Sequence, residues 1–239
     1  MYGVKRGRGN AVWRKKGLIT IKDTIVSASL LACDMTKAAE EIRRCESAGV
    51  DWIHYDVMDG HFVEQISYGT PVLKCVRKCT KMPVDVHLMV ERPDRQAEFF
   101  AEAGADIIDI HVESPCDIGA CLKRIRELGK SPALAVKPDT PIEAAFEYLP
   151  LCDMVLVMTV EPGYGGQGFL ADMLPKVRAL REYADGNGFQ NLDIQVDGGI
   201  NEKTGADARK AGANVLVAGT GLFNASDMKA ANAALKGTL

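Results

Sequence analysis

The 239-residue sequence predicts an α/β fold, a single (β/α)8 TIM barrel that spans residues 21–239. From residue 24 onward, short apolar runs alternate with longer amphipathic stretches, and the pattern occurs eight times without a linker. Such repetition is typical of strand–helix units around one parallel sheet, and the length is sufficient for one large core. A doubly wound sheet is the alternative, but the Gly-x-Gly-x-x-Gly motif that usually follows its first strand is missing.

The predicted strands are rich in Val, Ile and Leu. Apolar runs of this kind are typical of strands that are buried on both faces of a parallel sheet. Between them, apolar residues recur three and four positions apart, as in Ala38, Ile42 and Cys45, which predicts helices. The strands are predicted at residues 24–31, 51–57, 83–89, 106–112, 132–137, 153–160, 192–197 and 214–219.

Residues at the expected helix ends support these boundaries. Thr140-Pro141-Ile142-Glu143 predicts a helix start with an N-cap, a proline at the first helical position and a capping-box glutamate. Glycines stand where the residue after a helix needs a positive φ. They are Gly49, Gly104, Gly129 and Gly212.

Composition excludes several classes of protein. The chain carries 29 Lys and Arg against 32 Asp and Glu, so nothing predicts a nucleic-acid partner. No apolar run reaches the ~18 to 20 residues of a membrane-spanning helix, so no membrane partner is expected. The seven cysteines lack the spacing of a disulfide scaffold or a paired zinc motif, which favours a reducing compartment and a cytoplasmic protein.

The first twenty residues differ from the rest, with six positive charges and no negative ones. They lack the apolar region of a secretory signal. We expect residues 1–20 to form a basic, disordered extension. A transit peptide, a nucleic-acid-binding arm or a start site set too early are the alternatives.

Four polar residues occur where strands are expected to end, which is where such barrels hold their active sites. His54 and Asp56 are two apart on the second strand and share a face. His87 lies near the end of the third strand, and Asp197 ends the seventh. Two imidazoles and two carboxylates suit one divalent ion of zinc, iron, manganese or cobalt. The alternative is that these groups only satisfy one another in the barrel mouth.

Other side chains near the strand ends have two interpretations each. Met58, Met89 and Met158 reach the same layer, either as core filling or as an apolar collar that excludes water from the site. His111 also ends a strand, but no partner for it is visible, so we interpret it as structural. His61 is interpreted as a loop residue of uncertain role.

Glycine-rich segments follow the last three predicted strands. Glycine lets backbone N–H groups approach an anion, and these loops are the usual phosphate site of the fold. Tight turns are the alternative for any one of them, but three in succession favour phosphate binding. The segments include Gly163, Gly165 and Gly166, then Gly198 and Gly199, then Gly219 and Thr220.

Together these residues suggest a reaction. A metal ion could bind a carbonyl and the neighbouring hydroxyl and stabilise the enediolate formed when the carbon between them loses a proton. Asp56 and Asp197 would face each other across the barrel, so that one removes the proton and the other returns one to the opposite face. The configuration of that carbon would then be inverted.

Four motifs closely resemble the ribulose-phosphate 3-epimerase family. They are HYDVMDGHF at residues 54–62, DVHLM at 85–89, VMTVEPGYGGQ at 157–167 and VDGG at 196–199, and the resemblance runs from about residue 25 to residue 223. It implies a pentose-phosphate-pathway enzyme that interconverts D-ribulose 5-phosphate and D-xylulose 5-phosphate. It also implies that the enzyme binds this small sugar phosphate and forms homo-oligomers.

The resemblance assigns roles to residues. By it, the catalytic acid/base pair is Asp56 and Asp197, and the ligands of one divalent ion per subunit are His54, Asp56, His87 and Asp197. Substrate and phosphate would be bound by Ser29, His87, Gly163, Tyr164, Gly165, Gly166, Asp197, Gly198, Gly199, Gly219 and Thr220.

Some positions depart from the family pattern. Ala28 replaces the proline that usually precedes the first-strand serine, Thr220 replaces a serine, and Gln65-Ile66-Ser67 replaces Asn-Ile-Thr. None removes a ligand or a base. An epimerase of D-allulose 6-phosphate and a non-catalytic sugar-phosphate-binding barrel remain alternatives. A barrel decarboxylase or aldolase is less consistent, because Met58 stands where those proteins have a lysine.

Overall fold

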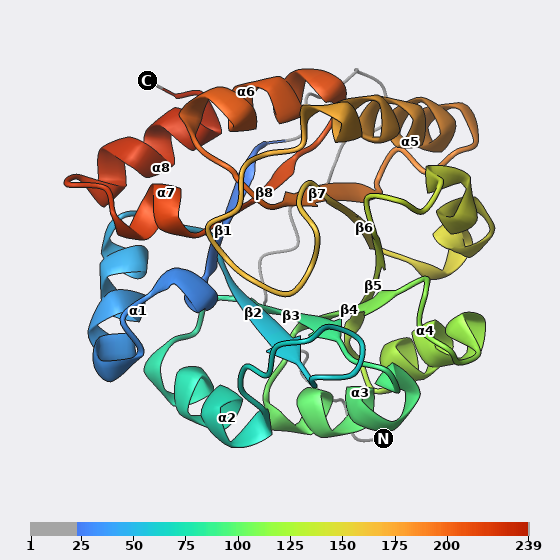
Figure 1. The fold of residues 1–239 in the computed structure, drawn as a ribbon, viewed down its shortest axis with the longest axis horizontal. Helices are drawn as coiled ribbons and strands as arrows, with labels where there is room; N and C mark the ends of the chain where they lie inside the picture. The colour runs from blue at the N-terminus through green and yellow to red at the C-terminus, as the bar shows by residue number, and fades with distance from the viewer. Residues whose placement is uncertain (1–22, 239) are drawn as a thin grey trace, which may run out of the picture.

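The computed structural model describes residues 23–238, which form a closed barrel of eight parallel strands with helices on the outside (Figure 1). The strands follow one another around the barrel in chain order, and the last pairs with the first. This arrangement confirms the predicted fold. The basic segment predicted to be disordered, residues 1–20, lies outside the described residues.

All eight predicted strands are present, and their ends differ from the predicted ones by at most two residues. Each strand is buried on both faces, because helices cover its outer face and the side chains of all the strands fill the barrel interior. The strands are β1 Ile25–Ser29, β2 Trp52–Met58, β3 Val84–Met89, β4 Ile107–His111, β5 Ser131–Val136, β6 Met154–Met158, β7 Asp193–Asp197 and β8 Val215–Ala218.

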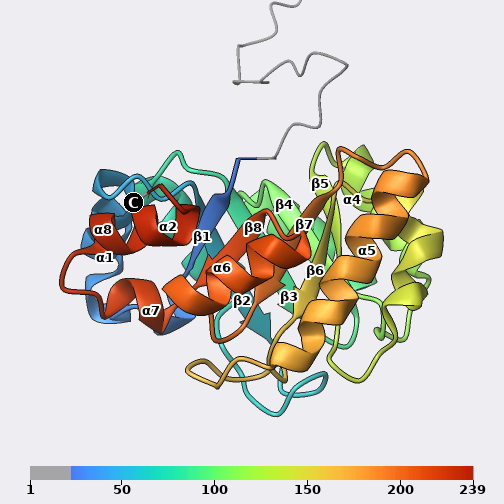
Figure 2. The same ribbon diagram turned by 90° about the horizontal axis from the view of Figure 1, so that it is seen from above.

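Helices connect successive strands on the outside of the barrel (Figure 2), and the loops that follow β2 and β6 project from the same end. The α-helices are α1 Ala38–Ser47, α2 Thr70–Cys79, α3 Pro93–Ala103, α4 Ile118–Glu127, α5 Leu174–Gly186, α6 Glu202–Ala211, α7 Thr220–Phe223 and α8 Met228–Lys236. Short 3₁₀ helices are η1 Leu30–Ala32, η2 Met35–Lys37, η3 Ile142–Leu151 and η4 Ala171–Met173. In the part of the chain described here, no helix has the length and apolar character needed to cross a membrane.

The predicted glycines after helices are confirmed. Gly49, Gly104, Gly129 and Gly212 have φ values of 75°, 115°, 73° and 113°. The predicted helix start at Thr140 is wrong, because Pro141 is the residue before the helix and η3 is a 3₁₀ helix without a side-chain cap. The ψ of Pro141 is 138°, so the chain is still extended there, and Pro150 inside η3 has no N–H to donate.

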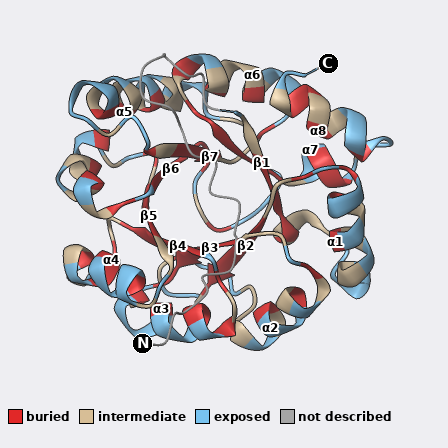
Figure 3. Ribbon diagram, turned by 180° about the vertical axis from the view of Figure 1, so that it is seen from behind, coloured by how far each residue is buried: buried red, intermediate tan, exposed pale blue. Residues whose placement is uncertain are grey.

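Burial is concentrated on the strands and on the helix faces that cover them (Figure 3). The interior of the barrel is different, because polar residues occupy its middle. The strand register places His54 of β2 beside Asp85 of β3, and Asp56 beside His87. These four side chains are almost completely buried, so the barrel interior contains a cluster of ionisable groups.

Candidate active site

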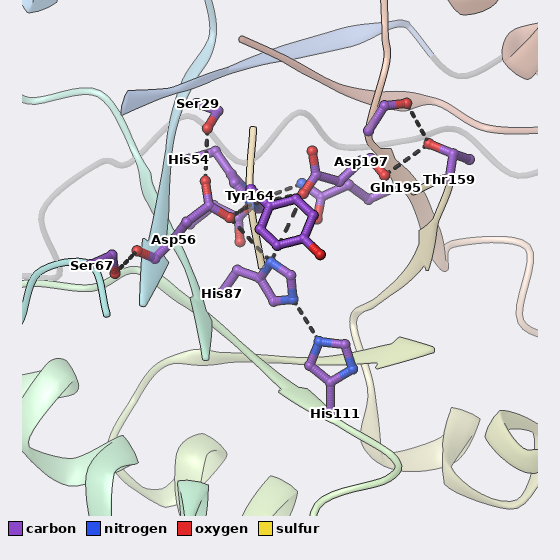
Figure 4. A network of polar contacts seen from close by, with 12 residues as sticks. Ser29, His54, Asp56, Ser67, His87, His111, Thr159, Tyr164, Gln195 and Asp197 are labelled. Carbon is purple, nitrogen blue, oxygen red and sulfur yellow. Dashed lines mark hydrogen bonds and ion pairs between the residues drawn. The ribbon is translucent and has the colours of Figure 1, made fainter. Parts of the chain in front are cut away.

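His54, Asp56, His87 and Asp197 form one cluster, in which each offers a ligand atom and all four atoms lie within 4.8 Å of one another. Asp56 Oδ1 lies 3.2 Å from His54 Nε2 and 3.3 Å from His87 Nδ1. Asp197 Oδ2, from the other side, lies 3.8 Å and 4.0 Å from the same two nitrogens (Figure 4). The fold therefore brings together the four residues predicted to hold a metal.

The bonding of His54 tests whether this cluster fits a cation. Its Nδ1 lies 2.8 Å from Asp85 Oδ2, whereas its buried Nε2 lies 3.2 and 3.8 Å from carboxylate oxygens of Asp56 and Asp197 without forming a well-oriented hydrogen bond to any described residue. A buried polar atom without a partner is uncommon, and this one faces two carboxylates. Since imidazole nitrogens and carboxylate oxygens are ligands of zinc, iron, manganese and cobalt, the cluster fits a divalent ion.

A second layer of buried polar groups lies beneath the cluster. The pKa of Asp85 is lowered despite its burial, chiefly by the charge of His54. Asp85 is therefore an acceptor for His54 Nδ1–H and for Gln195 Nε2, which donates over 2.6 Å. Burial and the charge of Asp85 raise the pKa of Asp109 well above its usual value, which favours the protonated form of this carboxyl group.

No role of Asp85, Asp109 or Gln195 is predicted from the sequence. One signal was available for Asp85, because it is two residues before His87 and shares its strand face. Gln195 is 110 positions away along the chain, so only the closed barrel reveals this contact.

The two predicted acid/base residues have opposite electrostatics. Burial raises the pKa of Asp56, but the charges and hydrogen bonds of His54 and His87 outweigh it and hold this pKa well below its usual value. Asp56 Oδ2 also accepts a hydrogen bond from Ser29 Oγ over 2.7 Å. In contrast, burial and the charge of Asp56 raise the pKa of Asp197 to about 6. Environments that separate two pKa values in this way are typical of acid/base pairs.

A cavity opens above the cluster. Most residues predicted to bind substrate or phosphate line it, as do all three methionines of the predicted collar. His87 is different: it is fully buried and does not line the cavity. The predicted residues that line it are Ser29, Asp56, Met58, Met89, Met158, Gly163, Tyr164, Gly165, Gly166, Asp197, Gly198, Gly199, Gly219 and Thr220.

The bend after β7 requires glycine at two positions. Gly198 and Gly199 have φ values of 119° and 66°. A Cβ on Gly199 would lie 2.5 Å from the backbone N of Phe169. Thr159 holds the same bend, because its backbone N and Oγ1 donate to the Asp197 carbonyl oxygen over 2.7 and 2.8 Å. The loop that contains Tyr164 thus packs directly on the segment that carries Asp197.

His111 has partners, so its predicted isolation is wrong. Its Nε2 lies 2.9 Å from His87 Nε2, and its Nδ1 lies 3.0 Å from Glu113 Oε2. Spacing along one strand could not show this, because the contact crosses from β4 to β3. Burial lowers the pKa of His111 to about 4. His61, in contrast, is an exposed loop residue as predicted, and its Nδ1 lies 3.1 Å from the Asp59 carbonyl oxygen.

Comparison with known proteins gives a consistent result. A model of the ribulose-phosphate 3 epimerase family matches residues 25–223. A protein from Synechocystis sp. named ribulose-phosphate 3-epimerase is 43% identical over 217 residues, which cover 90% of this chain and 94% of that protein. A protein of the same name from Eremothecium gossypii is 45% identical over 216 residues, which cover 86% of this chain and 88% of that protein. The structure of a 3-hexulose-6-phosphate synthase superposes with a TM-score of 0.64 at 20% identity, over 90% of this chain and 99% of the other, and shows a shared fold.

Proposed function

The chain belongs to the ribulose-phosphate 3-epimerase family, and from this premise we propose that it interconverts D-ribulose 5-phosphate and D-xylulose 5-phosphate. The observation that carries the proposal is the pair Asp56 and Asp197. The two carboxyl groups belong to the same cluster but come from different strands, β2 and β7, and their pKa values are shifted in opposite directions.

Epimerisation at one carbon requires a proton to leave from one face and another to arrive at the opposite face. The reaction therefore begins with one ionised and one protonated carboxyl group. Asp56, with its low pKa, is ionised and accepts a proton at a carboxylate oxygen. Asp197, whose pKa in the metal-free site is raised to about 6, is the carboxyl group of the two that takes up a proton more readily for donation to the other face. The roles exchange in the reverse direction.

We propose that His54, Asp56, His87 and Asp197 hold one divalent ion of zinc, iron, manganese or cobalt per subunit. When bound, the ion supplies Lewis-acid stabilisation of negative charge that develops on the substrate oxygens. The protein residues around it exclude water. Met58, Met89 and Met158 are each at most 5% exposed and line the cavity, and a dry site strengthens electrostatic interactions with the substrate.

The proposed substrate-binding residues surround the same cavity. Ser29 Oγ is placed by its hydrogen bond to Asp56, and the glycine segments after β6, β7 and β8 present backbone to the cavity. Tyr164, which is 56% exposed, lies in front of the cluster in Figure 4. Backbone N–H groups in such loops suit a phosphate, so we assign the phosphate of the substrate to this side.

The substrate is tested by measuring turnover of D-ribulose 5-phosphate and D-allulose 6-phosphate by the purified, metal-loaded protein. We expect a higher kcat/KM for the pentose. A higher value for the hexose would preserve the mechanism but change the substrate. Absence of turnover with both, in protein that contains metal, would favour a non-catalytic binding protein and refute the proposal.

The requirement for metal is tested on the same preparation. Chelation should abolish turnover, and Zn²⁺, Fe²⁺, Mn²⁺ or Co²⁺ should restore it. Full activity in the chelated protein would contradict the proposed ion site.

Two further properties stay predictions. All seven cysteines are free thiols, which supports our proposal that the protein works in the reducing cytoplasm. Assembly into homo-oligomers is expected from the family resemblance alone, and mass measurement in solution would test it.

A further inference from the structure

A row of three side chains in contact leads from the ion site on β3, through His111 at the end of β4, to Glu113 in the segment that follows β4. His87 Nδ1 faces the cluster, and its other nitrogen, Nε2, lies 2.9 Å from His111 Nε2. Figure 4 shows this contact between His87 and His111. His111 Nδ1 in turn lies 3.0 Å from Glu113 Oε2. Glu113 Oε1 accepts a hydrogen bond from the backbone N–H of Lys137 over 2.8 Å, which connects these three side chains to the residue after β5.

The contact between the two imidazoles fixes where their protons lie. Two ring nitrogens at 2.9 Å form a hydrogen bond only if one carries a proton and the other does not. If His87 Nδ1 presents its lone pair to an ion, His87 Nε2 carries the proton and His111 Nε2 accepts it. The proton of neutral His111 is then on Nδ1, where it donates to the Glu113 carboxylate. Each atom in this row therefore has one consistent role.

We propose that His111 and Glu113 are positioning residues that fix the tautomer and orientation of the metal ligand His87. This inference rests on the ion site of the proposed function. Metal-bound histidines usually donate their second N–H to a carboxylate or carbonyl group, and loss of that partner weakens metal binding. His54 has such a carboxylate directly, in Asp85, whereas His87 reaches one through a second imidazole.

The surroundings of His111 hold its ring in place. Its ring lies edge to edge with the ring of His87, with centroids 5.0 Å apart and an angle of 29° between the two planes. The centroid of the Phe62 ring is 4.7 Å from that of His111. Lys137 Nζ lies 3.8 Å from the centre of that Phe62 ring. Phe62 contributes shape to this packing but no hydrogen bond to His111, so it offers a matched control.

The competing interpretation is that His111 only fills buried space. The two interpretations differ in what must be retained at position 111. A positioning role requires a hydrogen-bond acceptor for His87 Nε2–H, whereas a packing role requires only a ring of similar volume. His111→Phe keeps a ring and removes the acceptor, and His111→Gln does the reverse.

The first experiment measures Zn²⁺ affinity by competition with a chromophoric chelator. We expect His111→Phe to bind Zn²⁺ about 10- to 100-fold more weakly, while His111→Gln stays within a few-fold of the unmodified chain because its amide oxygen can accept. Phe62→Leu should stay within about twofold, since the hydrogen bonds persist. Equal affinity of His111→Phe and the unmodified chain would overturn the inference.

The second experiment reads the tautomers directly, by ¹⁵N NMR of histidine-labelled protein with Zn²⁺. We expect protons on His87 Nε2 and His111 Nδ1. A proton on His111 Nε2 would overturn the inference without any variant, so the test survives if His111→Phe fails to fold. If the unmodified chain binds no divalent ion, the ion site of the proposed function fails and the inference fails with it. If that chain binds the ion and the variants bind it equally well, the inference alone fails.

Discussion

Replacing either of the two proposed acid/base residues should lower turnover by orders of magnitude, but the effects on stability should have opposite signs. Asp197→Asn removes a partly buried carboxylate whose pKa is raised to about 6 by desolvation and by the charge of Asp56. In metal-free protein this group destabilises the folded state once it ionises. Asp56→Asn removes a carboxylate that the two histidines stabilise.

The magnitude for Asp197 follows from its pKa. The difference between about 6 and the ordinary value of 3.8 corresponds to about 3 kcal/mol. Because the side chain is 18% exposed, solvent screening reduces this to about 1–2 kcal/mol. The raised pKa stabilises the folded state fully below about pH 4, and this contribution is lost as the pH rises through about 6. Metal-free Asp197→Asn should therefore be more stable than the unmodified chain at pH 7.5, with the advantage disappearing near pH 4.

The pKa shift of Asp56 affects the pH dependence of stability in the opposite direction. Its lowered pKa stabilises the folded state above the ordinary value of 3.8, and this stability is lost as the pH falls below it. Asp56→Asn also leaves His54 and His87 without their anion and Ser29 with a weaker acceptor. We expect a loss of about 3 kcal/mol at pH 7.5, as for other broken buried pairs.

The assay is urea unfolding of chelator-treated proteins from pH 4 to pH 8, with Asp172→Asn, at an exposed position in η4, as the control. In terms of melting temperature, the gain for Asp197→Asn is roughly 2–8 °C for a chain of this size. Turnover of both metal-loaded variants should fall by about 10²- to 10⁴-fold. A lower stability of Asp197→Asn at pH 7.5, or an advantage that persists unchanged at pH 4, would refute the electrostatic reasoning.

Three further outcomes are expected. Gly199→Ala should raise KM strongly and lower the free energy of unfolding by about 3 kcal/mol, since the new Cβ would meet the Phe169 backbone at 2.5 Å. Gly166→Ala places its Cβ in open space and should lower the free energy of unfolding by only about 1 kcal/mol; equal losses for the two variants in urea unfolding would contradict this. Asp85→Asn should weaken Zn²⁺ binding about tenfold, because His54 Nδ1–H would lose a charged acceptor; unchanged affinity in chelator competition would contradict it. Inorganic phosphate should inhibit competitively with the sugar phosphate, and a purely noncompetitive pattern in initial-rate measurements would place the phosphate site elsewhere.

Much of the fold could be predicted from local patterns. The eight apolar runs became the eight strands because a parallel barrel buries both faces of each strand, which leaves a continuous signal in the sequence. Gly104 and Gly212 marked helix ends because φ values of 115° and 113° are accessible almost only to glycine. The start of η3 was misplaced because the same Thr-Pro pattern is compatible with an extended proline.

The residues of the site likewise fall into those that the sequence indicates and those that only the structure identifies. The sequence alone indicated His54, Asp56, His87 and Asp197, because strand ends of a barrel converge and residue type restricts the chemistry.

Only the tertiary structure decided which second partner each histidine has. Asp85 meets His54 across two strands, and His111 meets His87 in the same way. Such contacts depend on the register between strands and on the closure of the barrel. These features arise from packing of the whole chain, and spacing within one segment does not encode them.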